Sequence, residues 1–144
     1  MDSEESERYM SYFEELKRRG REANPFFVMM GIEVDSIGEG TAQLSMQVRP
    51  DMQNGVGWMQ GGIFTAMADE AMALALYTVL SPGEGIATIS ETTSFLKGAR
   101  DEFLVATGRV VRKGRRVAFT EGDVRKGTAN GEILARCAAA FAIL

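Results

Sequence analysis

The sequence predicts an α+β protein in which an antiparallel sheet of about six strands wraps around one long central helix. Three observations support this prediction. About six segments show strand-like patterns, a stretch of about twenty residues is almost wholly apolar, and two of the strands precede that stretch whereas four follow it. A helix that is apolar all round needs cover on every side, and a curled sheet provides it.

The first elements follow from local signals. Ser3–Arg19 is predicted to be an amphipathic helix, because acids lie in its first turns and bases in its last. An Asn-Pro pair starts a short helix over 25–30, which a glycine ends. Strands over Gly31–Ile37 and Thr41–Val48 flank a Gly-Glu-Gly turn, so we expect them to form a hairpin.

The apolar stretch is predicted to be the central helix, over 61–80, opened by a glycine pair and ended by a Ser-Pro-Gly turn. The residues after it alternate in the manner of strands and contain Lys-Gly and Asn-Gly turns, which are typical of an antiparallel meander. The four strands expected there are Gly85–Leu96, Glu102–Arg112, Arg115–Val124 and Glu132–Ile143.

Length and charge narrow the class of protein. The 144 residues fit a single domain over 1–144, with the helix of residues 1–20 packed on it. A net charge of −4 argues against a nucleic-acid partner. Asp69 and Glu70 interrupt the apolar run, so a core helix is favoured over a membrane span. The single Cys137 and the lack of a secretory signal predict a cytoplasmic protein.

The sequence contains no histidine. This excludes a Ser-His-Asp or Cys-His nucleophile system, a His-ligated zinc ion and a His-based dehydratase. Acid–base chemistry near neutral pH therefore falls to carboxylates, Lys, Tyr or water. We expect no metal and no redox cofactor.

Asp69 is the candidate for that chemistry, because a carboxylate in an apolar helix needs a partner or a purpose. Gly61 lies eight residues earlier, at the bared N–H groups of the helix start, roughly 12 Å away along the axis. One carbonyl group cannot contact both positions of the same helix, so a site that uses both needs two subunits. Glu70 faces elsewhere on the helix and is predicted to meet solvent or an interface. The plain alternative for Asp69 is a partly exposed acid at a helix end or a subunit contact.

The residues Asn54, Gly57, Gln60, Gly61, Gly62 and Asp69 follow a family motif. The stretch resembles the hotdog-fold thioesterases of the phenylacetate-degradation type, whose motif runs N-x-x-G-x-x-H-G-G with an Asp seven residues after the second Gly. The resemblance extends from about Pro25 to the C-terminus. It implies a hotdog fold, hydrolysis of an acyl-CoA or similar thioester, and a homodimer that pairs into a dimer of dimers.

The resemblance also implies roles for residues. Asp69 would activate water or attack the thioester itself, the Gly61 N–H would hold the oxyanion, and Asn54 would orient the reacting groups from the partner subunit. Thr88, on the strand after the helix, would assist, although Ser90 and Thr92 are expected to share its face. Gln60 stands where the family usually has His, so we expect Asp69 to set the pH dependence.

Substrate-binding residues are expected around this motif. Gly62, Trp58 and Phe64 are candidates for the pocket, although large apolar residues are also ordinary core. Arg112, Lys113 and Arg115 form either a solvated turn or a site for the coenzyme A phosphates. The alternative to an enzyme is a non-catalytic acyl-CoA-binding module, which would need neither Asp69 nor Asn54.

Overall fold

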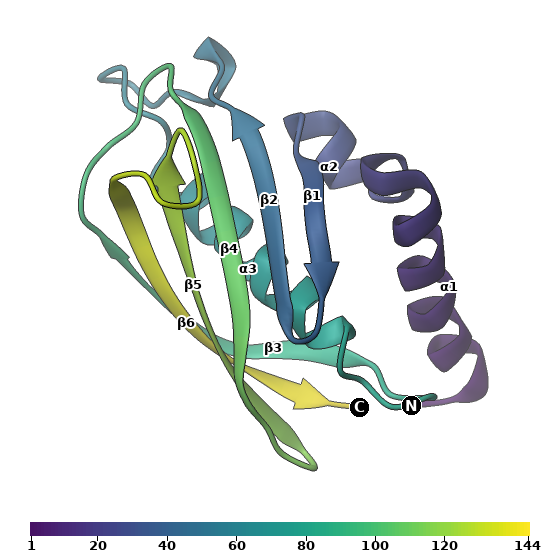
Figure 1. The fold of residues 1–144 in the computed structure, drawn as a ribbon. Helices are drawn as coiled ribbons and strands as arrows, with labels where there is room; N and C mark the ends of the chain where they lie inside the picture. Colours follow the sequence, from purple (N-terminus) through teal and green to yellow (C-terminus); the bar gives the residue numbers. More distant parts are fainter.

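A single antiparallel sheet and one long helix form the centre of the molecule in the computed structural model, which describes residues 1–144 (Figure 1). The sheet has the strand order β1-β2-β4-β5-β6-β3, so β1 and β3 are its edges. Its strands are β1 (Glu33–Gly38), β2 (Thr41–Gln47), β3 (Ile86–Phe95), β4 (Phe103–Lys113), β5 (Val117–Lys126) and β6 (Ile133–Ile143). The predicted α+β class and six-strand arrangement around a helix are confirmed.

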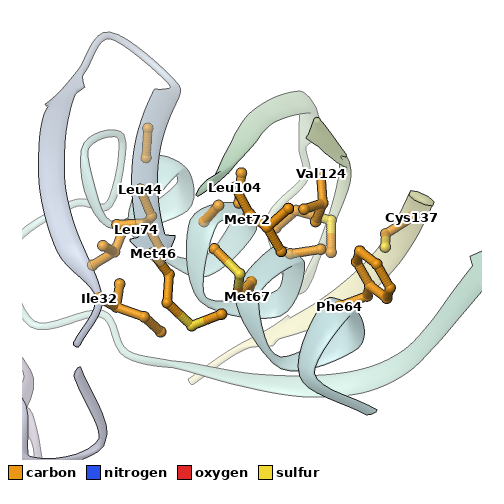
Figure 2. Packing of buried hydrophobic residues seen from close by; sticks show 14 of the residues in the cluster. Ile32, Leu44, Met46, Phe64, Met67, Met72, Leu74, Leu104, Val124 and Cys137 are labelled. Carbon is orange, nitrogen blue, oxygen red and sulfur yellow. The ribbon is translucent and has the colours of Figure 1, made fainter. Parts of the chain in front are cut away.

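The central helix, α3 (Gly61–Tyr77), supplies much of the core between itself and the sheet. Figure 2 shows its Phe64, Met67 and Met72 lying among side chains from several strands. At Gly108 of β4 the helix backbone comes so close that an added Cβ would lie 2.4 Å from the carbonyl carbon of Ala71. Only glycine therefore fits at this crossing of helix and strand. The residues of α3 that are buried are Phe64, Met67, Ala68, Ala71, Met72, Leu74, Ala75 and Leu76.

The helix ends at Tyr77, three residues earlier than the predicted end at Leu80. The hydroxyl of Thr78 donates to the carbonyl of Ala75 at 2.7 Å and accepts from the N–H of Gly40 at 2.7 Å. The end of α3 is thus tied to the β1–β2 turn, which the local sequence alone does not reveal. The predicted strand boundaries agree with the structure to within two residues.

The N-terminal segment contains α1 (Ser3–Arg19), the 3₁₀ turn η1 (Gly20–Ala23) and α2 (Pro25–Met30), and a second 3₁₀ turn, η2 (Pro50–Met52), follows β2. The rings of Tyr9, Tyr12 and Phe13 in α1 surround Tyr77 with centroids 6.3, 5.7 and 5.6 Å from it. The Tyr9 hydroxyl also donates to the Ile86 carbonyl at 3.0 Å. Helix α1 therefore covers the region where α3 ends and β3 begins. None of the helices combines the length and apolarity of a membrane span.

Candidate active site

Asp69 lies midway along α3 and is half-buried against β3. The hydroxyl of Thr88, near the start of that strand, donates to Asp69 Oδ1 at 3.1 Å. A hydrogen bond to a carboxylate is stronger than one between neutral groups and fixes the orientation of the acid. The structure thus brings together two of the predicted site residues within one chain.

A β-bulge in β3 decides which side chains accompany Thr88. Thr88 pairs with Phe141 of β6, whereas Ser90 pairs with the adjacent Ala140, so Ile89 is an extra residue in the strand. An extra residue shifts the two-residue alternation by one. Beyond the bulge, Thr93 therefore bonds to Thr65 of α3 at 2.8 Å. The prediction that Ser90 and Thr92 share the face of Thr88 is wrong.

Glu91 lies on β3 two residues beyond the bulge at Ile89. Burial, the charge of Asp69 and a side-chain hydrogen bond with Asp69 raise the pKa of Glu91 to about 8. Its Oε1 atom is buried and has no hydrogen-bond partner. The sequence analysis missed this residue. The available signal was an acid inside a strand of hydroxyl and apolar residues, a strand that runs beside an apolar helix.

Glu70 is half-buried rather than open to solvent, and the alternative that it meets an interface stays a prediction. It lines a pocket of about 290 Å³ together with Tyr12 of α1, Asn24, Tyr77 and other residues. Burial first, and the charge of Asp69 second, raise the pKa of Glu70 to about 7. Thr88 lines the same pocket, so this cavity adjoins the Asp69 site. Glu70 is shielded from solvent because α1 packs over α3.

The start of α3 presents its N–H groups next to Phe95. Gly61 is half-exposed and Gly62 exposed, and an added Cβ on Gly61 would lie 3.3 Å from the Phe95 ring. The first N–H groups of a helix have no partner within it, so they are suited to an anionic oxygen. Gln60 is the residue before the helix, and its exposed side chain makes no capping hydrogen bond.

Asn54 and Trp58 belong to the loop that leads into α3. The Asn54 side-chain oxygen accepts from the N–H groups of Val56 at 3.0 Å and Trp58 at 3.2 Å, so it holds the loop together. Its side-chain amide remains to donate elsewhere. Trp58 packs tightly on Gly98, and the Arg100 guanidinium lies 4.0 Å from its ring centroid.

The other substrate-binding candidates lie in different surroundings. Phe64 is 3% exposed and belongs to the core, and its ring centroid lies 6.2 Å from that of the exposed Phe95. Arg112 and Arg115 are exposed near the tip of the β4–β5 hairpin, whereas Lys113 Nζ pairs with Glu84 at 3.0 Å. This hairpin extends from the end of the sheet opposite the loop that precedes α3 (Figure 1). Within one chain, the basic residues and the α3 start are therefore separated.

The chain is similar in sequence and in fold to known proteins of one family. The profile of the Thioesterase superfamily matches residues 57–132. Human acyl-coenzyme A thioesterase 13 is 25% identical over 109 residues, covering 76% of this chain and 77% of its own length. A mutant of the phenylacetic acid degradation protein PaaI from Thermus thermophilus is 24% identical with a TM-score of 0.76, over 84% of this chain and all of its own. A conserved protein from Pseudomonas aeruginosa gives a TM-score of 0.78 at 24% identity, over 84% and 94% of the two chains.

Proposed function

The chain belongs to the thioesterase superfamily and is a thioester hydrolase, and from this premise we propose that it hydrolyses acyl-coenzyme A at Asp69. The observation that carries the proposal is a half-buried carboxylate on a central helix, oriented by the Thr88 hydroxyl. The family match spans Gly61, Asp69 and Thr88. The name of the human relative supports acyl-coenzyme A as the thioester.

In the proposed reaction Asp69 acts as general base. It removes a proton from water as the water oxygen attacks the thioester carbon, while the Gly61 N–H stabilises the oxyanion. The carbon–sulfur bond then breaks, the electron pair leaves with sulfur, and Asp69 returns the proton to the thiolate. Thr88 bonds one carboxylate oxygen and keeps the base in place. Direct attack by Asp69 would instead form an anhydride with the acyl group.

We further propose that each site is shared by two copies of the chain. Eight residues of continuous helix separate Gly61 from Asp69, roughly 12 Å along the axis, too far for one thioester carbonyl. Strand β3 supports pairing, because it is a ten-residue edge strand with Ile89 58% exposed. An edge of this length is a template for another strand. Two copies joined there would bring the Asn54 loop and Gly61 of one to Asp69 of the other.

The test is thiol release from short, medium and aryl acyl-coenzyme A substrates. The wild-type protein should release thiol, and Asp69→Asn should lower kcat at least about 100-fold because the amide cannot accept the proton. Asp123→Asn, which changes an acid on β5, is the matched control and should retain activity. Tight acyl-coenzyme A binding without thiol release by the wild type would contradict the proposal and favour a binding module.

A further inference from the structure

We propose that Arg100, held over the ring of Trp58, binds a phosphate group of coenzyme A. The inference rests on the proposed function, because it takes acyl-coenzyme A as the substrate. Coenzyme A carries a pyrophosphate group and a ribose phosphate at the end of the molecule far from its thiol. Arg100 lies beside the loop that leads into α3, whereas Arg112 and Arg115 lie at the opposite end of the sheet within one chain (Figure 1).

Two loops hold the backbone of Arg100 in place. One loop leads into α3, and the other connects β3 to β4 and carries Arg100. The N–H of Met59 in the first loop donates to the carbonyl of Ala99 in the second at 2.7 Å. The side-chain amide of Gln53 donates to the carbonyl of Arg100 at 3.1 Å. Arg100 is therefore fixed relative to the residues that precede α3.

The ring of Trp58 orients the Arg100 side chain. The guanidinium carbon lies 4.0 Å from the ring centroid, which is within the range of a cation–π contact. Gly98 lets the ring approach the second loop closely, since an added Cβ there would lie 2.7 Å from the Cε3 atom of Trp58. A guanidinium that is already oriented loses less conformational freedom when it binds an anion.

The exposed guanidinium of Arg100 has no acidic partner in the chain. The Glu102 carboxylate accepts instead from the backbone N–H groups of Arg100 at 2.5 Å and Asp101 at 3.1 Å. Lys97, in the same loop, differs from Arg100 because its Nζ pairs with Glu132 at 2.9 Å. The N–H donors of Arg100 are thus available for a phosphate, whose oxygens a guanidinium binds in pairs.

Exposed apolar side chains accompany the path from Gly61 to Arg100. Phe95 adjoins Gly61 and is 57% exposed, and Trp58 adjoins Arg100 and is 40% exposed. Trp58 precedes Gly61 by three residues, so the chain between them spans at most about 11 Å. With the thioester carbonyl at the Gly61 N–H, the long pantetheine arm passes over these two rings and brings a phosphate to Arg100.

Substrates with and without phosphate groups test this role. Acyl-coenzyme A carries the phosphates, whereas acyl-pantetheine with the same acyl group lacks them. We expect Arg100→Ala to raise KM for acyl-coenzyme A about three- to tenfold at unchanged kcat, and to leave kcat/KM for acyl-pantetheine within about twofold. Arg100→Lys should show a smaller rise, because lysine keeps the charge but loses the paired donors. Lys97→Ala is the matched control and should change neither value.

An unchanged KM for acyl-coenzyme A in Arg100→Ala would overturn the inference. An equal loss with both substrates would also overturn it, because that result identifies the contact of Arg100 with Trp58 as a structural support of the loop.

Calorimetry with coenzyme A itself tests the contact without relying on hydrolysis. Arg100→Ala should weaken the affinity about three- to tenfold, and the difference from wild type should shrink as salt is added. The affinity for pantetheine should be the same in both proteins. Equal affinities for coenzyme A, or no binding of coenzyme A by the wild type, would contradict the inference. The expected loss of affinity in a protein that releases no thiol contradicts only the proposed function.

Discussion

Three carboxyl groups, those of Asp69, Glu70 and Glu91, lie around one stretch of α3, and each has different surroundings. Asp69 receives a hydrogen bond from Thr88, burial and the charge of Asp69 raise the pKa of Glu91 on β3, and Glu70 lines the pocket under α1. All three are carboxylic acids, so the differences between their roles come from their surroundings and not from the residue type. Glu70 is the member of this group whose effect should appear in stability.

At the residue scale we predict that Glu70 makes folding less favourable as pH rises. Its pKa is about 7 in the folded protein against an ordinary 4.5. Below 4.5 both states are protonated and there is no penalty; between 4.5 and 7 the penalty grows, and above 7 it is complete. Glu70→Gln should therefore raise the free energy of unfolding at pH 8 by at most about 3 kcal/mol.

Urea unfolding at pH 5 and pH 8, at one protein concentration, measures this effect. The gain of Glu70→Gln over wild type should be much larger at pH 8 than at pH 5. Glu7→Gln, which changes an exposed acid on α1, should show no comparable pH dependence. An equal difference between Glu70→Gln and wild type at both pH values would show that burial of an ionising Glu70 is not the cause.

At the element scale, local patterns predicted most of the helices and strands, because caps, turns and alternation act over a few residues. The face of β3 could not be predicted in this way. The bulge at Ile89 depends on how the strand pairs with β6, which is set by residues about fifty positions later. The same limit applies to Glu70, whose cover comes from Tyr12 of α1. The Asp69 and Gly61 candidates came from spacing within one helix, which sequence reports directly.

The prediction at this scale concerns the β4–β5 hairpin. If Arg112 and Arg115 bind the phosphates of coenzyme A, replacing both with Ala should raise KM about three- to tenfold and leave kcat unchanged. Both side chains are exposed, so the effect should weaken as salt is added. Lys113 is unsuitable for this test because it pairs with Glu84. Steady-state kinetics at low and high salt give the measurement, and Arg18→Ala on α1 is the control.

An unchanged KM in the Arg112 and Arg115 double variant would identify the hairpin as a solvated turn. A fall in kcat with constant KM would also contradict phosphate binding, because phosphates far from the reacting carbon should contribute equally to the ground state and the transition state. Within one chain, this hairpin lies at the end of the sheet opposite the loop that precedes α3 (Figure 1). The effect of the double variant on KM therefore also bears on whether two copies of the chain share a site.

At the scale of the whole molecule, the components of the site point to more than one copy. Within one chain, Asp69 of α3 is hydrogen-bonded to Thr88 of the edge strand β3, which also carries Glu91. The Asn54 loop and Gly61 lie at the start of the same helix, where Asp69 cannot use them. A second copy joined along β3 in antiparallel fashion would supply both, and it would create two equivalent sites.

Mixed dimers test this arrangement. Asp69→Asn lacks the base, and Asn54→Asp retains the side-chain oxygen that holds the loop but loses the amide donor. Each variant alone should be nearly inactive. In a mixed dimer one site combines the intact Asp69 of one chain with the intact Asn54 of the other, so a random mixture should recover about one quarter of wild-type activity. Co-expression with two affinity tags followed by thiol-release assays measures the recovery. Sites built within single chains would show no recovery, because every chain in the mixture carries a defect.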